Sequence, residues 1–190
     1  MADRRVLALD LGTSSVRALV FDDRGAPLPD MLARRPTQLD ITDEGKAELD
    51  PDGVVAAIGE CLDELNGRGD LDGVQDVATS CAWHSVIALD RDGRRLTGAL
   101  TWADTRAAPL VGELRSRGDM DRLQAATGAR PHTLYWTVKL PWLAGELSPA
   151  PARYLGLAEY ATGALLGDPG ASPSMASGTG LLHLATATWD

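Results

Sequence analysis

The chain has 190 residues, 44% hydrophobic and 24% charged, which is long and apolar enough for one globular domain with a core. Its net charge is −9 and its two lysines are Lys46 and Lys139, which argues against the clustered basic surface that nucleic acids or anionic membranes require. An acidic chain can still bind a phosphate-bearing small molecule, because backbone N–H groups and a metal ion supply local positive potential.

Targeting and redox signals are sparse. No segment approaches the ~20 consecutive apolar residues that a membrane span needs, and the first apolar run breaks at Asp10. Cys61 and Cys81 lack the paired spacing and the neighbouring histidines of a metal site. We therefore expect free thiols and a cytoplasmic protein that interacts with neither membrane nor nucleic acid.

The first elements predicted are antiparallel strands. Apolar runs at 6–11 and 16–22 are joined by the turn Gly12-Thr13-Ser14-Ser15. A second turn at 22–25 leads into a third strand that extends toward Arg35. The chain therefore opens as an antiparallel meander.

A polar segment and a helix follow. Residues 41–51 are typical of a loop that ends with Asp50 as a helix N-cap and Pro51 at the first helical position. Apolar residues then recur at steps of three and four from Val54 to Leu65, which predicts a helix. Gly67 stands where a C-terminal cap is expected.

The rest of the chain alternates between strand and helix patterns. Strands are predicted at 74–81, 86–90 and 95–102, and helices at 106–117, 120–127, 135–145 and 152–162. Pro141 should kink or start the helix in which it lies, and the apolar stretch near the C-terminus has the pattern of a strand. The whole pattern predicts an α/β fold, with a mixed β-sheet, an N-terminal antiparallel meander and flanking helices.

Asp10 and the turn after it form the first candidate site. A carboxylate at the end of an apolar strand is costly when dry and unpaired, but it can hold a hydrated Mg²⁺ at a cleft. The turn offers backbone N–H groups and hydroxyls to phosphate oxygens, and Arg17 shares a strand face with Ser15. The alternative is an ordinary hairpin turn in which Asp10 caps the backbone. The spacing alone leaves both open.

Four motifs in order along the chain resemble the FGGY carbohydrate kinases of the actin-like ATPase superfamily. They are LALDLGTSSVRALVFDDRG (7–25), SCAWHSVIALDRDGRRLTGALTWADTRA (80–107), ATGARPHTLYWTVKLPWL (126–143) and MASGTGLLHLATATWD (175–190). The segment Trp83-His84-Ser85 and the run from Ser174 to Gly180 are most similar to the gluconate kinases. The resemblance implies an RNase-H-like sheet flanked by helices, with residues 1–190 as an incomplete N-terminal domain.

The resemblance also implies site residues. Asp10 would bind Mg²⁺, and the ATP phosphates would be contacted by Gly12, Thr13, Ser14, Ser15 and Arg17. The sugar would be contacted by Trp83, His84, Asp104 and Arg106. ATP is then the co-substrate.

Each sugar-site assignment has a structural alternative. Trp83 and His84 could be a packed aromatic pair at a strand end, with the imidazole satisfied by its neighbours. Asp104 could be the N-cap of the helix predicted at 106–117, and Arg106 could be a surface charge. The residues alone leave these alternatives open.

The expected function is therefore that of the N-terminal part of an ATP-dependent carbohydrate kinase, with gluconate as the first candidate substrate. FGGY kinases are longer, and the general-base aspartate is expected beyond residue 190, together with a second actin-like domain. The chain alone is then expected to be inactive, and surfaces left open could promote self-association. A pentulose or polyol kinase and a non-catalytic sugar- or nucleotide-binding domain are the alternatives.

Overall fold

A computed structural model describes residues 4–167 and 170–189. The chain divides into two compact units, although length alone favours a single domain. The first unit contains residues 4–39 and 50–82, and the second contains residues 40–49 and 83–189. The second unit therefore includes a short segment that interrupts the first unit in sequence.

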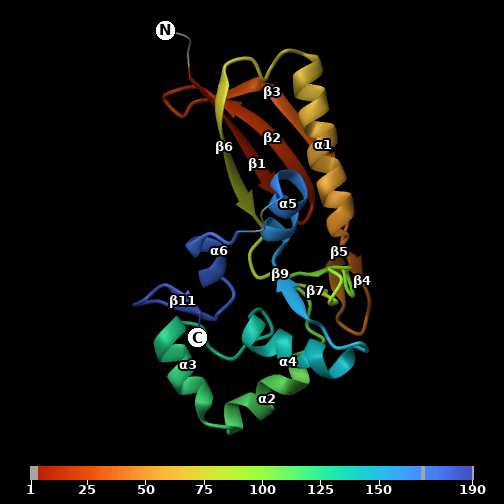
Figure 1. Ribbon diagram of the computed structural model, residues 1–190, viewed down its shortest axis with the longest axis vertical. Helices are drawn as coiled ribbons and strands as arrows, with labels where there is room; N and C mark the ends of the chain where they lie inside the picture. The colour runs from red at the N-terminus through yellow and green to blue at the C-terminus, as the bar shows by residue number, and fades with distance from the viewer. Residues whose placement is uncertain (1–3, 168–169, 190) are drawn as a thin grey trace. The chain divides into compact units, whose positions relative to one another are not determined.

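The first unit is a four-stranded mixed sheet with one helix on it (Figure 1). Its elements are β1 (Arg5–Leu11), β2 (Ser15–Phe21), β3 (Pro27–Pro36), α1 (Pro51–Gly67) and β6 (Val74–Cys81). The strand order is β3-β2-β1-β6, in which β1 pairs antiparallel with β2 and parallel with β6. The predicted meander and the strand at 74–81 are both confirmed.

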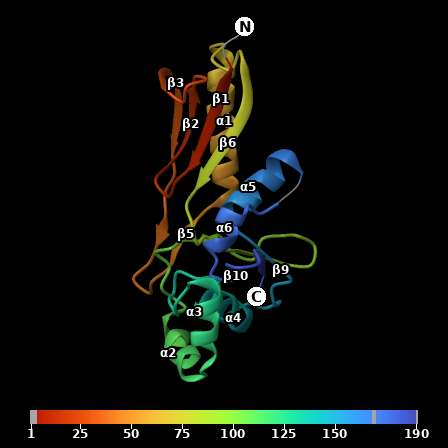
Figure 2. The ribbon, with the colours of Figure 1, turned by 90° about the vertical axis from the view of Figure 1, so that its left-hand side faces the viewer.

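Helix α1 covers one face of this sheet (Figure 2). Alternate residues of β1 and β2 are buried under it, because successive side chains of a strand point to opposite faces. The core of this unit comprises Leu7, Leu9, Leu11, Val16, Ala18 and Val20 from the sheet and Val54, Ile58, Cys61 and Leu65 from the helix. Asp10 therefore lies on the opposite face of the sheet, at the end of a strand whose other face is buried.

The start of α1 follows from its sequence. The Asp50 carboxylate accepts hydrogen bonds from the amides of Asp52 and Gly53, at 3.3 and 3.2 Å, and Pro51 is the first helical residue. The C-terminal prediction is wrong by one residue, because Gly67 is the last helical residue and Arg68 is the cap.

The second unit combines short strands with five helices among its described residues. Its elements are β4 (Asp40–Ile41), β5 (Ala47–Leu49), β7 (Ile87–Leu89), β8 (Ala99–Leu100), α2 (Ala108–Ser116), α3 (Asp119–Thr127), α4 (Trp136–Glu146), β9 (Arg153–Leu155), α5 (Leu157–Leu166), α6 (Pro173–Ser177), β10 (Leu182–His183) and β11 (Thr188–Trp189). Helices α2, α3 and α4 lie together at the lower end of Figure 1.

Two predictions in this unit are wrong. The segment at 41–51 is a hairpin of β4 and β5 rather than a loop, and β5 pairs with β8. The helix expected from residue 152 begins at Leu157, because residues 153–155 form β9 and pair with β7. β9 and one edge of β5 pair with strands distant in sequence, and the β4–β5 hairpin itself is very short, so a local pattern does not reveal them.

The core of the second unit forms where α4 meets the short strands. Val86, Ala88 and Leu100 are buried against Trp136 and Leu143 of α4. Pro141 lies inside α4 without ending it. Cys61 is a buried free thiol, and Cys81 is partly exposed. Among the described residues, no helix combines the length and apolar character that crossing a bilayer would require.

Candidate functional site

The turn between β1 and β2 presents unused backbone donors. Gly12 N donates to Ser15 O at 3.0 Å, and Thr37 N donates to Ser14 O at 3.0 Å, so both sides of the turn are held. The amides of Thr13 and Ser14 make no hydrogen bond with the rest of the described chain. A Cβ at Gly12 would lie 3.1 Å from Ser15 O, which favours glycine there. Two neighbouring free amides at a glycine turn suit an anion such as phosphate.

Asp10 and Arg17 face each other across β1 and β2 beside this turn. Arg17 Nη2 lies 3.0 Å from Asp10 Oδ2, and the two side chains are 50% and 40% exposed. An exposed pair of this kind contributes only about 0–1 kcal/mol, so either partner can exchange it for a ligand. No cluster of three or more metal-ligating side chains occurs in the described part of the chain. A Mg²⁺ at Asp10 would therefore keep water and phosphate ligands, as Mg²⁺ prefers.

Ser15 differs from the rest of the turn. Its residue is 0% exposed, and its Oγ is buried without a hydrogen-bond partner in the described chain. Gly12, Thr13 and Ser14 are at least partly exposed. Three of the four turn residues assigned to phosphate are therefore reachable by a ligand, and Ser15 is not reachable in this conformation.

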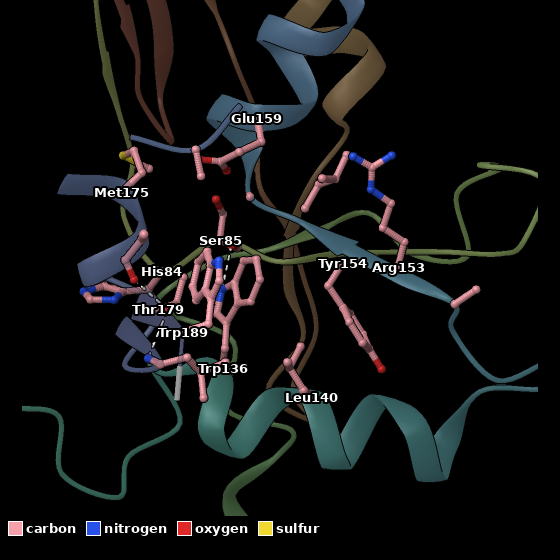
Figure 3. Close-up of a pocket in the computed structure, with 16 residues that line it drawn as sticks. His84, Ser85, Trp136, Leu140, Arg153, Tyr154, Glu159, Met175, Thr179 and Trp189 are labelled. Carbon is pink, nitrogen blue, oxygen red and sulfur yellow. Dashed lines mark hydrogen bonds between the residues drawn. The ribbon is translucent and has the colours of Figure 1, made fainter. Parts of the chain in front are cut away.

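The second unit contains a cavity of about 460 Å³ (Figure 3). Its wall comprises His84 and Ser85 from the segment after β6, Trp136 and Leu140 from α4, Tyr154 from β9, Glu159 from α5, and Met175 and Thr179 from around α6. Aromatic and apolar surfaces thus surround a few polar groups, as in sites for small polar ligands. Of the four residues that the sequence assigns to the sugar, only His84 lines this cavity.

The hydrogen bond and the burial of the His84 imidazole determine its tautomer and its charge. Its Nδ1 lies 2.5 Å from Gly178 O, and because a carbonyl only accepts, Nδ1 is the nitrogen that carries the proton. Burial lowers the pKa of His84, against the hydrogen bond to Gly178, which raises it. The ring is therefore neutral at pH 7, with Nε2 as an acceptor. Trp83 and Tyr135 contact it edge-on, with ring centroids 5.9 and 5.3 Å away.

Trp83 lies beside this cavity rather than in its wall. It is 49% exposed, and its ring packs near Gly178, where an added Cβ would lie 3.5 Å from ring carbons. Trp102, which the sequence analysis did not single out, is 54% exposed. Exposed aromatic faces of this kind can stack on the apolar face of a sugar ring.

The side chains of Asp104 and Arg106 form an ion pair. The Asp104 carboxylate, 1% exposed, accepts from Ala47 N at 3.1 Å, from Arg106 N at 3.2 Å and from the Arg106 guanidinium. Arg106 also pairs with Glu48 and lies 5.0 Å from the Trp142 ring centroid. These contacts join β5 to the segment after β8. The helix-cap alternative for Asp104 is wrong, because α2 begins after Ala107 without a side-chain cap.

Two buried ionisable residues of this unit escaped the sequence analysis. Glu159 is 8% exposed in the cavity wall, where burial raises its pKa and the amides of Gly156 and Glu159 itself lower it. The sequence does contain a pattern that could have identified Glu159. It stands three residues after the N-cap Gly156, the position at which a glutamate side chain reaches back to the start of a helix. Lys139 is 1% exposed, and burial lowers its pKa to about 8. No pattern in the sequence marks a lysine as buried.

Sequence comparison finds similarity to carbohydrate kinases. The model for the FGGY family of carbohydrate kinases, N-terminal domain, matches residues 5–190. The gluconokinase of Bacillus licheniformis is 26% identical over 190 residues, which cover 97% of this chain and 36% of the relative. A glycerol kinase of Rhizorhabdus wittichii is 32% identical over 198 residues, which cover 96% of this chain and 38% of the relative.

Solved structures agree with the sequence relatives. A gluconate kinase from Lactobacillus acidophilus superposes with a TM-score of 0.89 at 30% identity, covering 99% of this chain and 38% of its own. A ligand-bound xylulose kinase from the same organism has a TM-score of 0.89 at 30% identity and covers 98% and 38%. The expected actin-like ATPase fold is confirmed by these neighbours.

The chain spans about 36% of the length of the gluconokinases that it matches. The family model nevertheless covers nearly all of its residues. The chain belongs to the FGGY family of carbohydrate kinases, and its match is to the N-terminal domain of that family.

Proposed function

We propose that this chain is the N-terminal part of an ATP-dependent carbohydrate kinase that transfers the γ-phosphate of ATP to a hydroxyl of a sugar or sugar acid. The observation that carries the proposal is the turn after Asp10, where the free amides of Thr13 and Ser14 stand next to an accessible carboxylate. Family membership supports a nucleotide as the ligand of this turn, because a carbohydrate kinase needs a phosphate donor.

The proposed roles follow from the contacts. The amides of Thr13 and Ser14 donate to phosphate oxygens. The Arg17 guanidinium leaves the Asp10 carboxylate and donates two hydrogen bonds to the phosphate instead. Asp10 would hold Mg²⁺, and the ion would neutralise phosphate charge there. His84 accepts a hydrogen bond from a substrate hydroxyl through Nε2. The site fits the ion because the Asp10 carboxylate oxygens are accessible, and the unused amides suit the phosphate that would accompany it.

We propose that this chain binds the ligands and that the group accepting the hydroxyl proton belongs to polypeptide outside it. The aspartate that accepts the hydroxyl proton is proposed to lie beyond residue 190, within a second domain. Phosphoryl transfer depends on closing two sets of groups around the reactants and excluding water. The 190-residue chain is therefore proposed to bind ligands without turnover at an enzymatic rate.

Gluconate is the first proposed substrate and a pentulose or polyol is the alternative. Gluconokinases among the relatives support the first, and the equally similar xylulose kinase supports the second. Gluconate is an anion, but the Arg106 guanidinium is already held by Asp104 and Glu48. Arg153, which is exposed on the cavity wall, is the better placed cation for a sugar carboxylate.

Calorimetric titration of the purified chain tests the proposal. Gluconate, xylulose, glycerol and Mg-ATP are each titrated into the chain and into two variants, Asp10→Asn and His84→Asn. Asn tolerates the positive φ of position 84, so the backbone is preserved. We expect Asp10→Asn to weaken Mg-ATP binding alone and His84→Asn to weaken sugar binding alone.

Matched controls are Asp76→Asn, an exposed carboxylate on the same sheet, and His132→Asn, an exposed histidine of the second unit. Sugar binding without nucleotide binding would support the non-catalytic sugar-binding alternative. Binding of neither ligand by the wild-type chain would refute the proposal.

A further inference from the structure

A buried ammonium joins the two segments that were assigned to the sugar. Lys139, in the first turns of α4, is 1% exposed. Its Nζ donates to Thr101 O at 2.6 Å and to His84 O at 3.2 Å. Thr101 immediately precedes the segment from Trp102 to Arg106, and His84 lies on the cavity wall. One charged group therefore connects both segments through their backbones.

The backbone of His84 needs such support. Its φ is 67°, a left-handed conformation that a side chain with a Cβ adopts only when its surroundings impose it. Three neighbours constrain this point: the imidazole is held by Gly178 O, Ser85 O accepts from Trp136 Nε1 at 3.0 Å, and Ser85 Oγ accepts from Leu157 N at 2.9 Å. Lys139 holds the carbonyl of the strained residue itself.

Burying the Lys139 ammonium costs free energy, which argues against a role that is only to fill space in the core. Burial lowers the pKa of Lys139, the Asp104 carboxylate raises it and Arg106 lowers it, and together they bring it to about 8. A methionine would fill similar space without that cost, but it would leave the His84 carbonyl without its Lys139 donor, while Thr101 O would keep only Asp104 N at 3.2 Å. The charged groups around Lys139 come from the segment after β8, and His84 comes from the segment after β6.

We propose that Lys139 is a positioning residue of the carbohydrate site, whose buried ammonium fixes the His84 backbone and so aims the imidazole at the cavity. The inference rests on the proposed function only in taking the cavity ligand to be a carbohydrate. A neutral amine keeps two N–H donors for His84 O and Thr101 O, but it loses the charge that strengthens both hydrogen bonds, so the hold on the His84 carbonyl weakens when Lys139 loses its proton. Sugar affinity should then fall as the pH rises through about 8.

The test uses lysine labelled at Cε and Nζ, which gives only two side-chain signals because the chain has two lysines. NMR titration between about pH 6.5 and 9.5 follows Lys139, the His84 imidazole and the amide coupling that reports φ. His84 itself titrates below its usual value, so a response of its signals in the range where Lys139 loses its proton must come from Lys139.

The variant is Lys139→Met, and the matched control is Lys46→Met, which removes the other, partly exposed lysine paired with Asp40. We expect Lys139→Met to change the His84 coupling and to weaken binding of the best sugar in the panel by about tenfold or more. The remaining affinity should no longer depend on pH near 8. Lys46→Met should bind like the wild-type chain.

Unchanged His84 signals and an unchanged affinity in Lys139→Met would overturn the inference. If Lys139→Met does not fold, the wild-type titration decides: His84 signals that follow Lys139 support the inference, and signals that stay constant overturn it. If the wild-type chain binds neither sugar nor Mg-ATP, the proposed function fails, while the His84 signals still show whether Lys139 fixes the His84 backbone.

Discussion

Replacing Asp104 by alanine separates a structural role from a substrate role. The side chain is 1% exposed and is the acceptor for the amides of Ala47 and Arg106 as well as for the Arg106 guanidinium. Ala47 is itself 3% exposed, so its amide cannot turn to water. We therefore expect Asp104→Ala to destabilise the second unit.

The magnitude follows from the groups left without a partner. One buried amide that loses its acceptor costs about 1–3 kcal/mol. The Arg106 guanidinium keeps Glu48 and is 24% exposed, so its share is smaller than for a fully buried pair. The sum is about 3 kcal/mol, which at a urea m-value of about 2 kcal/mol/M lowers the unfolding midpoint by about 1.5 M.

Intrinsic fluorescence reports this transition selectively. All five tryptophans lie at or beyond residue 83 and therefore belong to the second unit. Asp92→Ala removes a carboxylate that is 69% exposed and paired with Arg94, so it should change the midpoint little. The reasoning is refuted if Asp104→Ala unfolds like Asp92→Ala. A lower sugar affinity at an unchanged midpoint would instead assign Asp104 to the substrate.

Three further predictions concern single contacts. Asp50→Ala should lower the unfolding free energy of the first unit by about 1 kcal/mol, because it removes the acceptor at the start of α1, and unchanged circular dichroism melts would contradict this. The pKa of His84 is lowered in the folded chain, so the unfolded chain takes up its proton first and stability falls as the pH drops below 6.5. Urea titrations across that range should show a smaller fall for His84→Asn, and equal falls would contradict the prediction. Gly156→Ala should lower the midpoint seen by tryptophan fluorescence, because its Cβ would meet the Glu159 carboxylate, and an unaltered midpoint would mean that this carboxylate relocates freely.

The local parts of the fold could be predicted from the sequence because their causes are local. The turn at Gly12 and the cap at Asp50 are both visible in a few consecutive residues. The segment at 41–51 was predicted as a loop because the strands of its β4–β5 hairpin are only two and three residues long, and the other partner of β5 is β8, about fifty residues later. The start of the helix before Leu157 was misplaced because residues 153–155 pair with β7.

The site divides in the same way. The sequence motifs, through their resemblance to a family, predicted Asp10, the glycine turn and His84 as site residues, and the structure leaves Asp10 and the turn accessible and His84 in a cavity wall. Tertiary structure alone decided that Ser15 is buried, that Asp104 and Arg106 are held together with Glu48, and that Lys139 lies under His84. Burial and distant pairing set the cost of each charge, and both depend on which segments meet after folding rather than on neighbours along the chain.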